Sequence, residues 1–309
     1  IFRVPLEAGR HGAPYLHVHR ADLLGVLAQA LGGEGLVTGA HAFGYRREGG
    51  RVMLMLADGS TPDGDVLVGA DGLHSVVRAQ MLGSDAPRWT GNVAWRMTVP
   101  ASDDLRAVIP PTACVWTGPG RHAVTYYVRG GDLINFVGVQ EVAGDAPPES
   151  WREPGDLETL ARIFEAFAAP VRAVIAAGET CHRWALFDRM PLPRWCDGPV
   201  TLLGDAAHPM LPFMAQGAAM AIEDGFALAQ ALSREDRPSE AVKAYETARL
   251  ARTARVQKQA RTNMTTFHHR SGVAQLAAYG PMWLAGRLLP GVINSRLDWL
   301  YGHDVVGVG

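Results

Sequence analysis

The sequence is short of cysteine, of net charge and of long uninterrupted apolar runs. Its 309 residues carry 29 Lys and Arg against 31 Asp and Glu, a formal net charge of -2. Nucleic-acid binders usually show a strong basic excess, so we expect no nucleic-acid partner. The three cysteines are odd in number and far apart, and they predict neither a disulfide framework nor a metal site. Their scarcity is typical of a reducing compartment, and we expect a cytoplasmic protein.

Nothing in the sequence is typical of a signal peptide or a membrane-spanning helix. The most apolar stretch, residues 213–232, carries Glu223 and Asp224 in its middle. Residues 273–292 are also apolar, but two prolines and Arg287 interrupt them. We therefore expect packed helices and no integral membrane segment. With 48% hydrophobic residues, the chain can bury the core of one large domain or of two.

Periodicity separates the chain into α/β and antiparallel segments. Two short apolar runs that end in glycine, residues 65–69 and 199–204, are typical of buried strands that feed loops. Between them, runs rich in Val, Thr, Tyr and Trp predict an antiparallel sheet over residues 93–99, 113–116, 122–128 and 133–139. Helical spacing of apolar residues predicts helices over residues 21–31, 156–177, 217–232 and 241–262.

This order predicts an α/β fold with an α+β insertion. We expect a first domain made of two separate segments, residues 1–86 and 185–309, the second of which includes the C-terminal helices. Residues 87–184 are expected to form an inserted antiparallel-sheet domain.

The most informative motif runs from Gly204 to Asp224 and reads GDAAHPMLPFMAQGAAMAIED. Asp205 follows the predicted strand at its carboxyl end, where ligands bind in open α/β sheets. An ionised aspartate accepts hydrogen bonds from hydroxyl groups. Gly217 and Ala218 begin the next helix, where small side chains let a flat ligand approach unpaired, partly positive N–H groups. The alternative is a plain strand-loop-helix crossover with a capping aspartate.

A second motif, VGADGLHSVVR over residues 68–78, also follows a strand that ends in glycine. Asp71 lies between Gly69 and Gly72, and Arg78 lies on the next turn or helix start. By itself this pattern is equally typical of an Asp-Gly turn with a helix N-cap. Two such motifs in one chain favour a ligand site over two unrelated turns.

Together the two motifs resemble the paired Asp-Gly and Gly-Asp fingerprints of FAD-dependent aromatic hydroxylases, the flavoprotein monooxygenases typified by para-hydroxybenzoate hydroxylase. The resemblance is closest to the salicylate and 3-hydroxybenzoate hydroxylases, and it runs over nearly the whole chain. HVHRADLL (residues 17–24), RWALFDRMPLPRW (183–195) and RLDWLYGHD (296–304) support it. It implies that residues 1–86 and 185–309 form a Rossmann-like FAD-binding domain and that residues 87–184 bind the substrate.

The resemblance also implies roles for the residues of the Gly-Asp motif. Asp205, next to Gly204, would accept a hydrogen bond from the ribityl chain of FAD. Gly217 and Ala218 would place backbone N–H groups near the pyrimidine edge of the flavin, which becomes negative on reduction. Pro209 would shape the loop beside the flavin ring.

The start of the chain departs from the family pattern. These enzymes begin with a strand, a GxGxxG turn and a helix that bind the ADP part of FAD, yet the sequence contains no GxGxxG and begins with Ile1. We expect that about the first quarter of a family member lies outside this chain. Of the residues present, the resemblance implies that Arg20 faces the phosphate-ribose part of FAD. Asp71 would lie in the fingerprint for both FAD and NAD(P)H.

The reaction implied by the resemblance is hydroxylation of a small aromatic acid or phenol. NADH or NADPH would reduce FAD, and oxygen would then give a flavin hydroperoxide that attacks the ring. His122 and Tyr126 are the candidate catalytic residues, because even spacing places them on one face of a predicted strand. A histidine whose pKa is near neutrality can take the proton of a phenol. The alternative is a surface histidine beside a half-buried tyrosine.

The sequence predicts structural or solvent-exposed roles for the other histidines and for the basic residues near them. His208 is expected to have a structural role in its loop, and His268 with His269 to be solvated rather than a metal site. Arg252, Arg255 and Lys258 are expected to form a solvated helix face. Two alternatives to hydroxylation stay open: an FAD-dependent epoxidase or reductase of an apolar substrate, and a cofactor-free binding protein. A homodimer is also left open.

Overall fold

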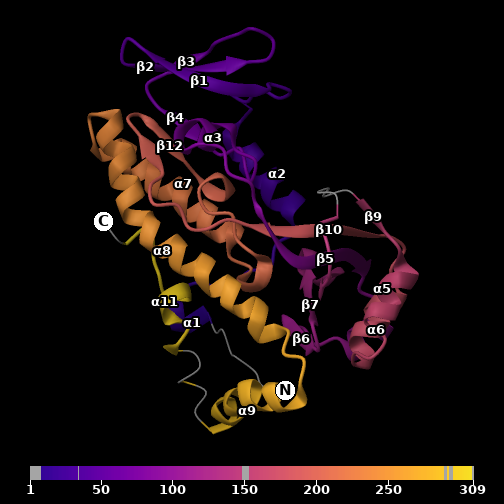
Figure 1. The fold of residues 1–309 in the computed structure, drawn as a ribbon. Helices are drawn as coiled ribbons and strands as arrows, with labels where there is room; N and C mark the ends of the chain where they lie inside the picture. The colour runs from indigo at the N-terminus through magenta and orange to yellow at the C-terminus, as the bar shows by residue number, and fades with distance from the viewer. Residues whose placement is uncertain (1–7, 34, 148–152, 289–290, 292–294, 308–309) are drawn as a thin grey trace. The chain divides into compact units, whose positions relative to one another are not determined.

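The computed structural model describes residues 8–33, 35–147, 153–288, 291 and 295–307 (Figure 1). The chain divides into two compact units, each made of separate stretches of sequence. The first unit takes its residues from 1–34, 89–186 and 265–303, and the second from 35–88, 187–264 and 304–309. The assignment of residues 1–86 and 185–309 to FAD and of 87–184 to substrate stays a prediction.

The first unit is built on a six-stranded sheet with the order β6-β7-β8-β5-β10-β9 (Figure 1). The pairs β6–β7, β7–β8 and β5–β8 are antiparallel, as the strand-rich runs predict. The pair β9–β10, which those runs do not include, is also antiparallel. The strands are β5 (Arg88–Pro100), β6 (Cys114–Gly118), β7 (Arg121–Val128), β8 (Leu133–Glu141), β9 (Glu153–Gly155) and β10 (Cys181–Asp188).

Helices cover one face of this sheet and bury the core of the first unit. They are α4 (Asp103–Val108), α5 (Leu157–Ile163) and α6 (Ala169–Ala176). The single helix predicted over residues 156–177 is therefore two helices. Pro170 lies in the first turn of the second helix, where its missing N–H breaks no hydrogen bond within the helix. Ala123 belongs to the core and Tyr127 packs against it. Alternation along β7 consequently places His122 and Tyr126 on the opposite face.

Four more helices belong to the first unit: α1 (Ala8–His11), α2 (Arg20–Leu31), α9 (Gly272–Leu288) and α11 (Asp298–Tyr301). Ion pairs involve three of these helices: Arg10 with Asp298 at 2.7 Å joins α1 to α11, and Asp22 on α2 contacts Arg129 at 2.8 Å. Within the part of the chain that the structure describes, every helix is too short or too polar to cross a membrane.

The second unit contains two small sheets and the longest helices. One sheet has the order β1-β2-β3 and the other β11-β12-β4. The strands are β1 (Ala42–Glu48), β2 (Arg51–Leu56), β3 (Asp63–Gly64), β4 (Leu67–Gly69), β11 (Cys196–Asp197) and β12 (Val200–Leu202). The helices are α3 (Val76–Leu82), α7 (Gly217–Arg234) and α8 (Pro238–Phe267), and α8 begins and ends outside its predicted range.

The contact between β4 and α3 requires a glycine at the end of the strand. A Cβ atom on Gly69 would lie 2.7 Å from Cβ of Val77 and 3.0 Å from Cδ2 of Leu202. We expect Gly69→Ala to lower the free energy of unfolding by about 1–3 kcal/mol, because strand and helix must separate. Denaturant unfolding monitored by circular dichroism measures this change.

Gly225→Ala is the matched control, because nothing lies within 4 Å of a Cβ atom there and the residue is inside α7. We expect this change to raise the free energy of unfolding by about 0.5–1 kcal/mol through helix propensity. Equal effects of the two substitutions would show that the contact between β4 and α3 is not tight.

Candidate functional site

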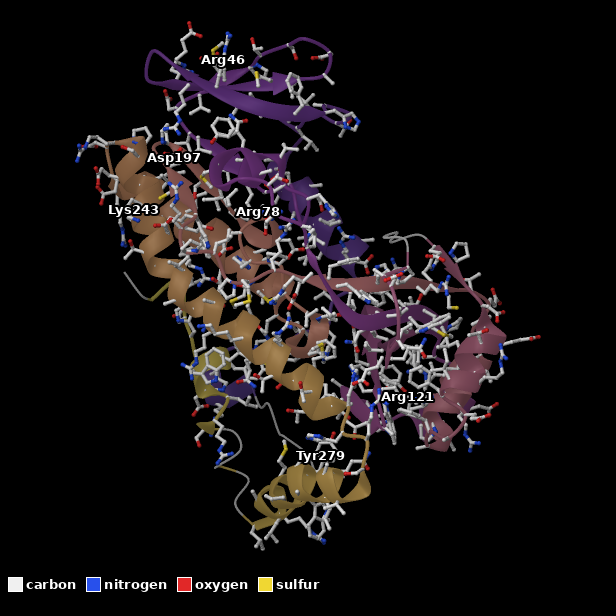
Figure 2. All side chains as sticks on the ribbon, viewed as in Figure 1. Arg46, Arg78, Arg121, Asp197, Lys243 and Tyr279 are labelled. Atoms are coloured by element: carbon white, nitrogen blue, oxygen red, sulfur yellow. The ribbon has the colours of Figure 1, made fainter. Side chains whose placement is uncertain are left out.

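The two sequence motifs meet at one edge of the sheet β11-β12-β4. Strands β4 and β12 are parallel, and Gly69 is opposite Leu202. Asp71 and Asp205 therefore both lie just beyond the carboxyl ends of neighbouring strands, as the sequence predicts. Arg78, labelled in Figure 2, is 2% exposed and joins the two loops. Its guanidinium donates to the carbonyl of Ala206 at 2.9 Å and to the carbonyl of Leu73 at 2.5 Å.

The Gly-Asp loop packs closely on α7 and exposes a single carboxylate. Gly204 has φ of +60°, and a Cβ atom there would lie 3.3 Å from Cβ of Ala221. Only glycine adopts this backbone without strain. Asp205 is exposed, while the residues after it through Pro209 are buried. The loop therefore presents the Asp205 carboxylate on a closely packed base.

The N-terminus of α7 supplies backbone donors beside this loop. Gly217 is half-buried and Ala218 is exposed at the first turn, where N–H groups have no partner within the helix. Side chains of α8 hold the intervening loop: Gln257 donates to the carbonyl of Pro209 at 2.9 Å, and Asn263 donates to the carbonyl of Phe213 at 3.2 Å. A hydroxyl-bearing ligand with an anionic edge fits a carboxylate next to a helix N-terminus.

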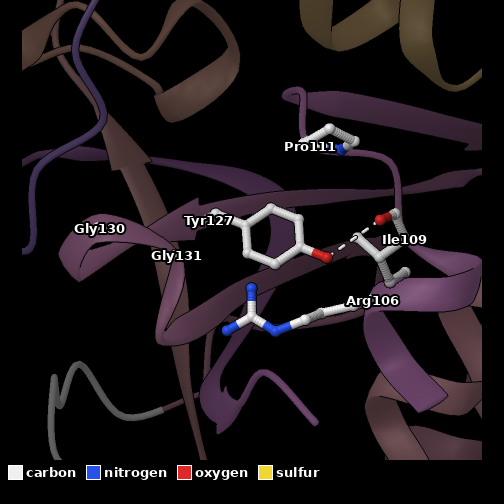
Figure 3. Close-up of a pocket in the computed structure, with 6 residues that line it drawn as sticks. All are labelled: Arg106, Ile109, Pro111, Tyr127, Gly130 and Gly131. Atoms are coloured by element: carbon white, nitrogen blue, oxygen red, sulfur yellow. Dashed lines mark hydrogen bonds between the residues drawn. The ribbon is translucent and has the colours of Figure 1, made fainter. Parts of the chain in front are cut away.

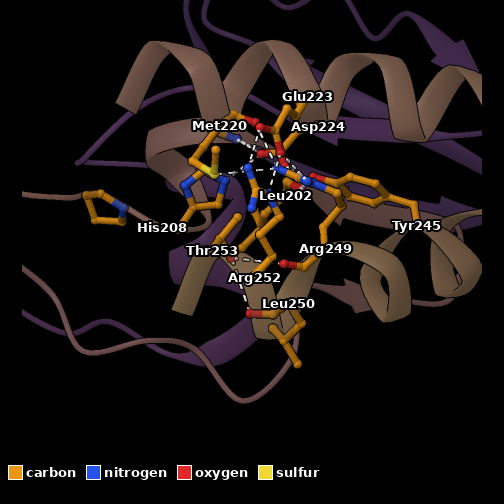
Figure 4. A network of polar contacts seen from close by, with 12 residues as sticks. Leu202, His208, Met220, Glu223, Asp224, Tyr245, Arg249, Leu250, Arg252 and Thr253 are labelled. Atoms are coloured by element: carbon orange, nitrogen blue, oxygen red, sulfur yellow. Dashed lines mark hydrogen bonds and ion pairs between the residues drawn. The ribbon is translucent and has the colours of Figure 1, made fainter. Parts of the chain in front are cut away.

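A buried ionic network fixes the Gly-Asp loop from behind (Figure 4). The Asp224 carboxylate accepts the N–H of Gly204 at 3.2 Å, contacts Nε2 of His208 at 2.5 Å and accepts Nε of Arg249 at 2.8 Å. The three side chains are almost inaccessible to water. Burial alone would raise the pKa of Asp224, but the hydrogen bonds and charges of His208 and Arg249 lower it below its ordinary value.

This network confirms the structural role expected for His208 and corrects one other interpretation. Arg252 is not part of a solvated face, because its Nε donates to Glu223 at 2.8 Å across α7 and α8. Arg255 and Lys258 are exposed, as expected. The sequence did carry a signal for the network: an acidic pair inside an apolar helix needs a buried partner, and the arginines of the next helix supply it.

The remaining cofactor candidates, Asp71 and Arg20, both lie near the beginning of a helix. Asp71 is exposed, and its carboxylate accepts the N–H groups of Val76 at 2.8 Å and Val77 at 3.3 Å, which caps α3. The N-cap itself is Ser75, whose hydroxyl accepts the N–H of Arg78 at 2.9 Å, so the alternative of a turn with an N-cap is observed. A role of Asp71 toward FAD or NAD(P)H stays a prediction. Arg20 is exposed at the start of α2, in the first unit.

His122 and Tyr126 share one face of β7, as their spacing predicts. The Tyr126 ring stacks on the ring of His17, with ring centres 4.8 Å apart and an angle of 28°. Burial raises the pKa of Tyr126, so its hydroxyl stays protonated near neutral pH. His122 is 2% exposed, and its Nδ1 lies 2.8 Å from Nε2 of His268.

Two expectations about the histidines are wrong. The pKa of His122 is not near neutrality: burial, with a smaller contribution from His268, lowers it to about 3. His268 is not solvated, since it is 4% exposed and its Nδ1 lies 3.3 Å from Oε1 of Glu141. Its carbonyl accepts the N–H of Gly120 just beyond the end of α8. No local sequence pattern signals these contacts, because His122 and Glu141 are more than 100 positions away from His268.

A pocket of about 530 Å³ opens on the other face of the same sheet (Figure 3). The hydroxyl of Tyr127 donates to the carbonyl of Ile109 at 3.0 Å within it. None of the predicted site residues lines this pocket, whose walls are Arg106, Ile109, Pro111, Tyr127, Gly130 and Gly131. Over the described residues, no group of three or more His, Cys, Asp or Glu side chains could hold a metal ion.

Comparison with known proteins agrees with this geometry. A family model described as an FAD binding domain matches residues 52–260. The chain is 42% identical over 301 residues to 3-hydroxybenzoate 6-hydroxylase 1 of Aquipseudomonas alcaligenes, covering 96% of this chain and 74% of that protein.

Two solved structures are similar along nearly the whole chain. A salicylate hydroxylase in a substrate complex has a TM-score of 0.77 at 26% identity, covering 95% of this chain and 76% of the other. Klebsiella pneumoniae HpxO complexed with FAD and uric acid has a TM-score of 0.82 at 26% identity, covering 94% and 75%. The match of the family model and the extent of these similarities show that the chain belongs to the FAD-dependent aromatic hydroxylases, a family of flavoprotein monooxygenases.

Proposed function

We propose that this protein hydroxylates a hydroxybenzoate and consumes oxygen and NADH or NADPH in the reaction. The relative named above acts on 3-hydroxybenzoate, and one structural neighbour is a salicylate hydroxylase. The observation that carries the proposal is the placement of His122 and Tyr126 on one face of β7, away from the helix-covered core. The neutral imidazole there can accept a hydrogen bond from a phenol, and the tyrosine hydroxyl can orient the ring.

In this proposal, residues of the second unit hold FAD. The Asp205 carboxylate accepts a hydroxyl of the ribityl chain, beside Gly204, while the N–H groups of Gly217 and Ala218 face the edge of the flavin that becomes negative. Buried Pro209 restricts the backbone conformation of the Gly-Asp loop. When bound, FAD supplies the oxygen chemistry that side chains cannot.

Further parts of the proposal concern the phosphate-ribose part of FAD, the cellular location and the oligomeric state. Arg20 would contact the phosphate-ribose part of FAD, and Asp71 would bind FAD or NAD(P)H through the carboxylate oxygen that does not cap α3. We also propose a cytoplasmic location and, as an assembly to be tested by sedimentation, a homodimer.

The direct experiment is the visible absorption spectrum of the protein before and after addition of FAD. We expect a bound-flavin spectrum that differs from that of free FAD. A panel of benzoates that differ only in the ring hydroxyl should then show faster NAD(P)H oxidation with the hydroxylated members, with a hydroxylated product found by mass spectrometry. Stimulation by apolar alkenes instead, with an epoxide as product, would favour the epoxidase alternative.

A further inference from the structure

The sheet of the first unit carries an arginine on the face that the helices leave uncovered. Arg96 lies on β5 between Trp95 and Met97, which both belong to the core. Alternation along the strand therefore places Arg96 on the opposite face, which is also the face of Tyr126. Arg96 is half-buried, and over the residues that the structure describes its guanidinium makes no hydrogen bond and no ion pair. This face therefore carries a positive charge without an acidic partner.

The register of the sheet brings an amide and a phenol next to this arginine. Asn135 on β8 is directly opposite Tyr126 on β7, and it is also opposite Thr98 on β5. Arg96 precedes Thr98 by two positions, so it is a diagonal neighbour of Asn135, within reach of a long side chain. Burial raises the pKa of Tyr126, and the charge of Arg96 opposes this rise. The guanidinium therefore lies toward Tyr126.

The amide of Asn135 has an unused hydrogen-bond donor. The residue is 3% exposed, and within the described part of the chain its Nδ2 has no hydrogen-bond partner. A buried donor without a partner destabilises the fold, and a ligand that accepts its hydrogen bond removes this penalty. Tyr126 is protonated near neutral pH and adds no negative charge. Positive charge beside an unused donor is the combination that binds an anion.

A carboxylate is the anion that this combination fits. The guanidinium is a planar fork that can donate two parallel hydrogen bonds to the two oxygens of a carboxylate. The amide of Asn135 can donate one more to either oxygen. The hydroxybenzoate of the proposed function carries such a group on its ring, and neither His122 nor Tyr126 is assigned to it. The substrate therefore has a charged group that still needs a partner.

We propose that Arg96 and Asn135 bind the carboxylate of the aromatic substrate and thereby select aromatic acids over neutral phenols. The inference rests on the proposed function, since it takes the substrate to be a hydroxybenzoate. Arg96 supplies the charge and the paired donors, and Asn135 supplies a third donor. Tyr126 borders the site with a ring that is held by its stacking on His17.

The competing explanation is that Arg96 supports the sheet or acts on the phenol hydroxyl. The two explanations are separated by 3-hydroxybenzoate and 3-hydroxybenzamide, which share the ring and the hydroxyl but differ in charge. Equilibrium dialysis in the presence of FAD and without NAD(P)H measures the binding of both compounds in the absence of turnover. The matched control is Arg172→Gln, because Arg172 is an exposed arginine on α6, which covers the other face of the sheet.

We expect the wild type to bind the acid more tightly than the amide. Arg96→Gln should weaken binding of the acid by about 10- to 100-fold, as expected for hydrogen bonds to charged groups, and change binding of the amide by less than about 3-fold. Asn135→Ala should weaken binding of both by about 3- to 10-fold, because the carbonyl oxygen of the amide also accepts a hydrogen bond. Arg172→Gln should bind both compounds as the wild type does.

Retained binding of the amide shows that Arg96→Gln is folded. If that variant does not fold, Arg96→Lys decides, since it keeps the charge and loses the fork, and we expect its preference for the acid to fall by about 3-fold or more. An unchanged preference in Arg96→Lys, equal losses of acid and amide in folded Arg96→Gln, or no binding of the acid by the wild type would overturn the carboxylate site.

Turnover distinguishes this inference from the proposed function. A wild-type protein that prefers the acid through Arg96 but does not hydroxylate it would contradict the proposed function and leave the carboxylate site standing. A wild-type protein that hydroxylates the acid and the amide with the same kcat/KM would keep the function as a hydroxylase and overturn the site.

Discussion

Asp224→Ala should lower the free energy of unfolding by about 3–5 kcal/mol, the cost of removing one partner of a buried ion pair. The substitution leaves the Arg249 guanidinium buried with Glu223 as its remaining carboxylate partner, and it removes the acceptor for the Gly204 N–H. Denaturant unfolding measures the loss. Glu235→Ala, an exposed acid at the end of α7, is the control and should have little effect.

The pH dependence of this loss has a definite sign. The pKa of Asp224 is lower in the folded protein than its ordinary value of 3.8, so its contribution to stability is present above that value and is lost as pH falls through the folded pKa. The stability difference between the wild type and Asp224→Asn should therefore shrink only under acidic conditions. A difference that disappears already near neutral pH would show that Asp224 is not ionised in the folded protein.

The second large effect concerns FAD. Asp205→Ala removes the exposed carboxylate of the Gly-Asp loop, and hydrogen bonds to charged groups contribute about 1.5–3 kcal/mol. We expect FAD affinity to fall by about 10- to 100-fold, measured by fluorescence titration of the flavin. Asp236→Ala is the control, because Asp236 is an exposed aspartate of the same unit. Unchanged affinity in Asp205→Ala would remove Asp205 from the cofactor site.

Sequence patterns predicted the parts of the fold that depend on neighbouring residues. Short apolar runs with a terminal glycine predicted two strands, and the structure pairs them in parallel; the first ends at Gly69 as predicted, whereas the second ends at Leu202, before Gly204. The alternation along β7 likewise placed His122 and Tyr126 on one face. Such features repeat every two to four residues, so a local pattern is enough to find them.

The contacts that sequence patterns missed join residues far apart in the chain. His268 was expected in water because it lies next to His269 in a polar stretch, yet His122, 146 positions earlier, takes it into the interior. The pKa of His122 could not be predicted for the same reason, since burial sets it. Asp224 was visible as an acid in an apolar helix, but its partner Arg249 becomes evident only when α7 and α8 pack together.

The bridge made by Arg78 has a consequence for protein engineering. One guanidinium holds the carbonyls of Leu73 and Ala206, so the Asp-Gly and Gly-Asp loops have one support in common. A chimaera that imports one loop from a relative keeps this support only if the imported backbone brings its carbonyl to the same donor. Lysine, with a single nitrogen at its tip, lacks the planar fork that reaches both carbonyls. The two loops are therefore best exchanged as a pair, together with the arginine between them.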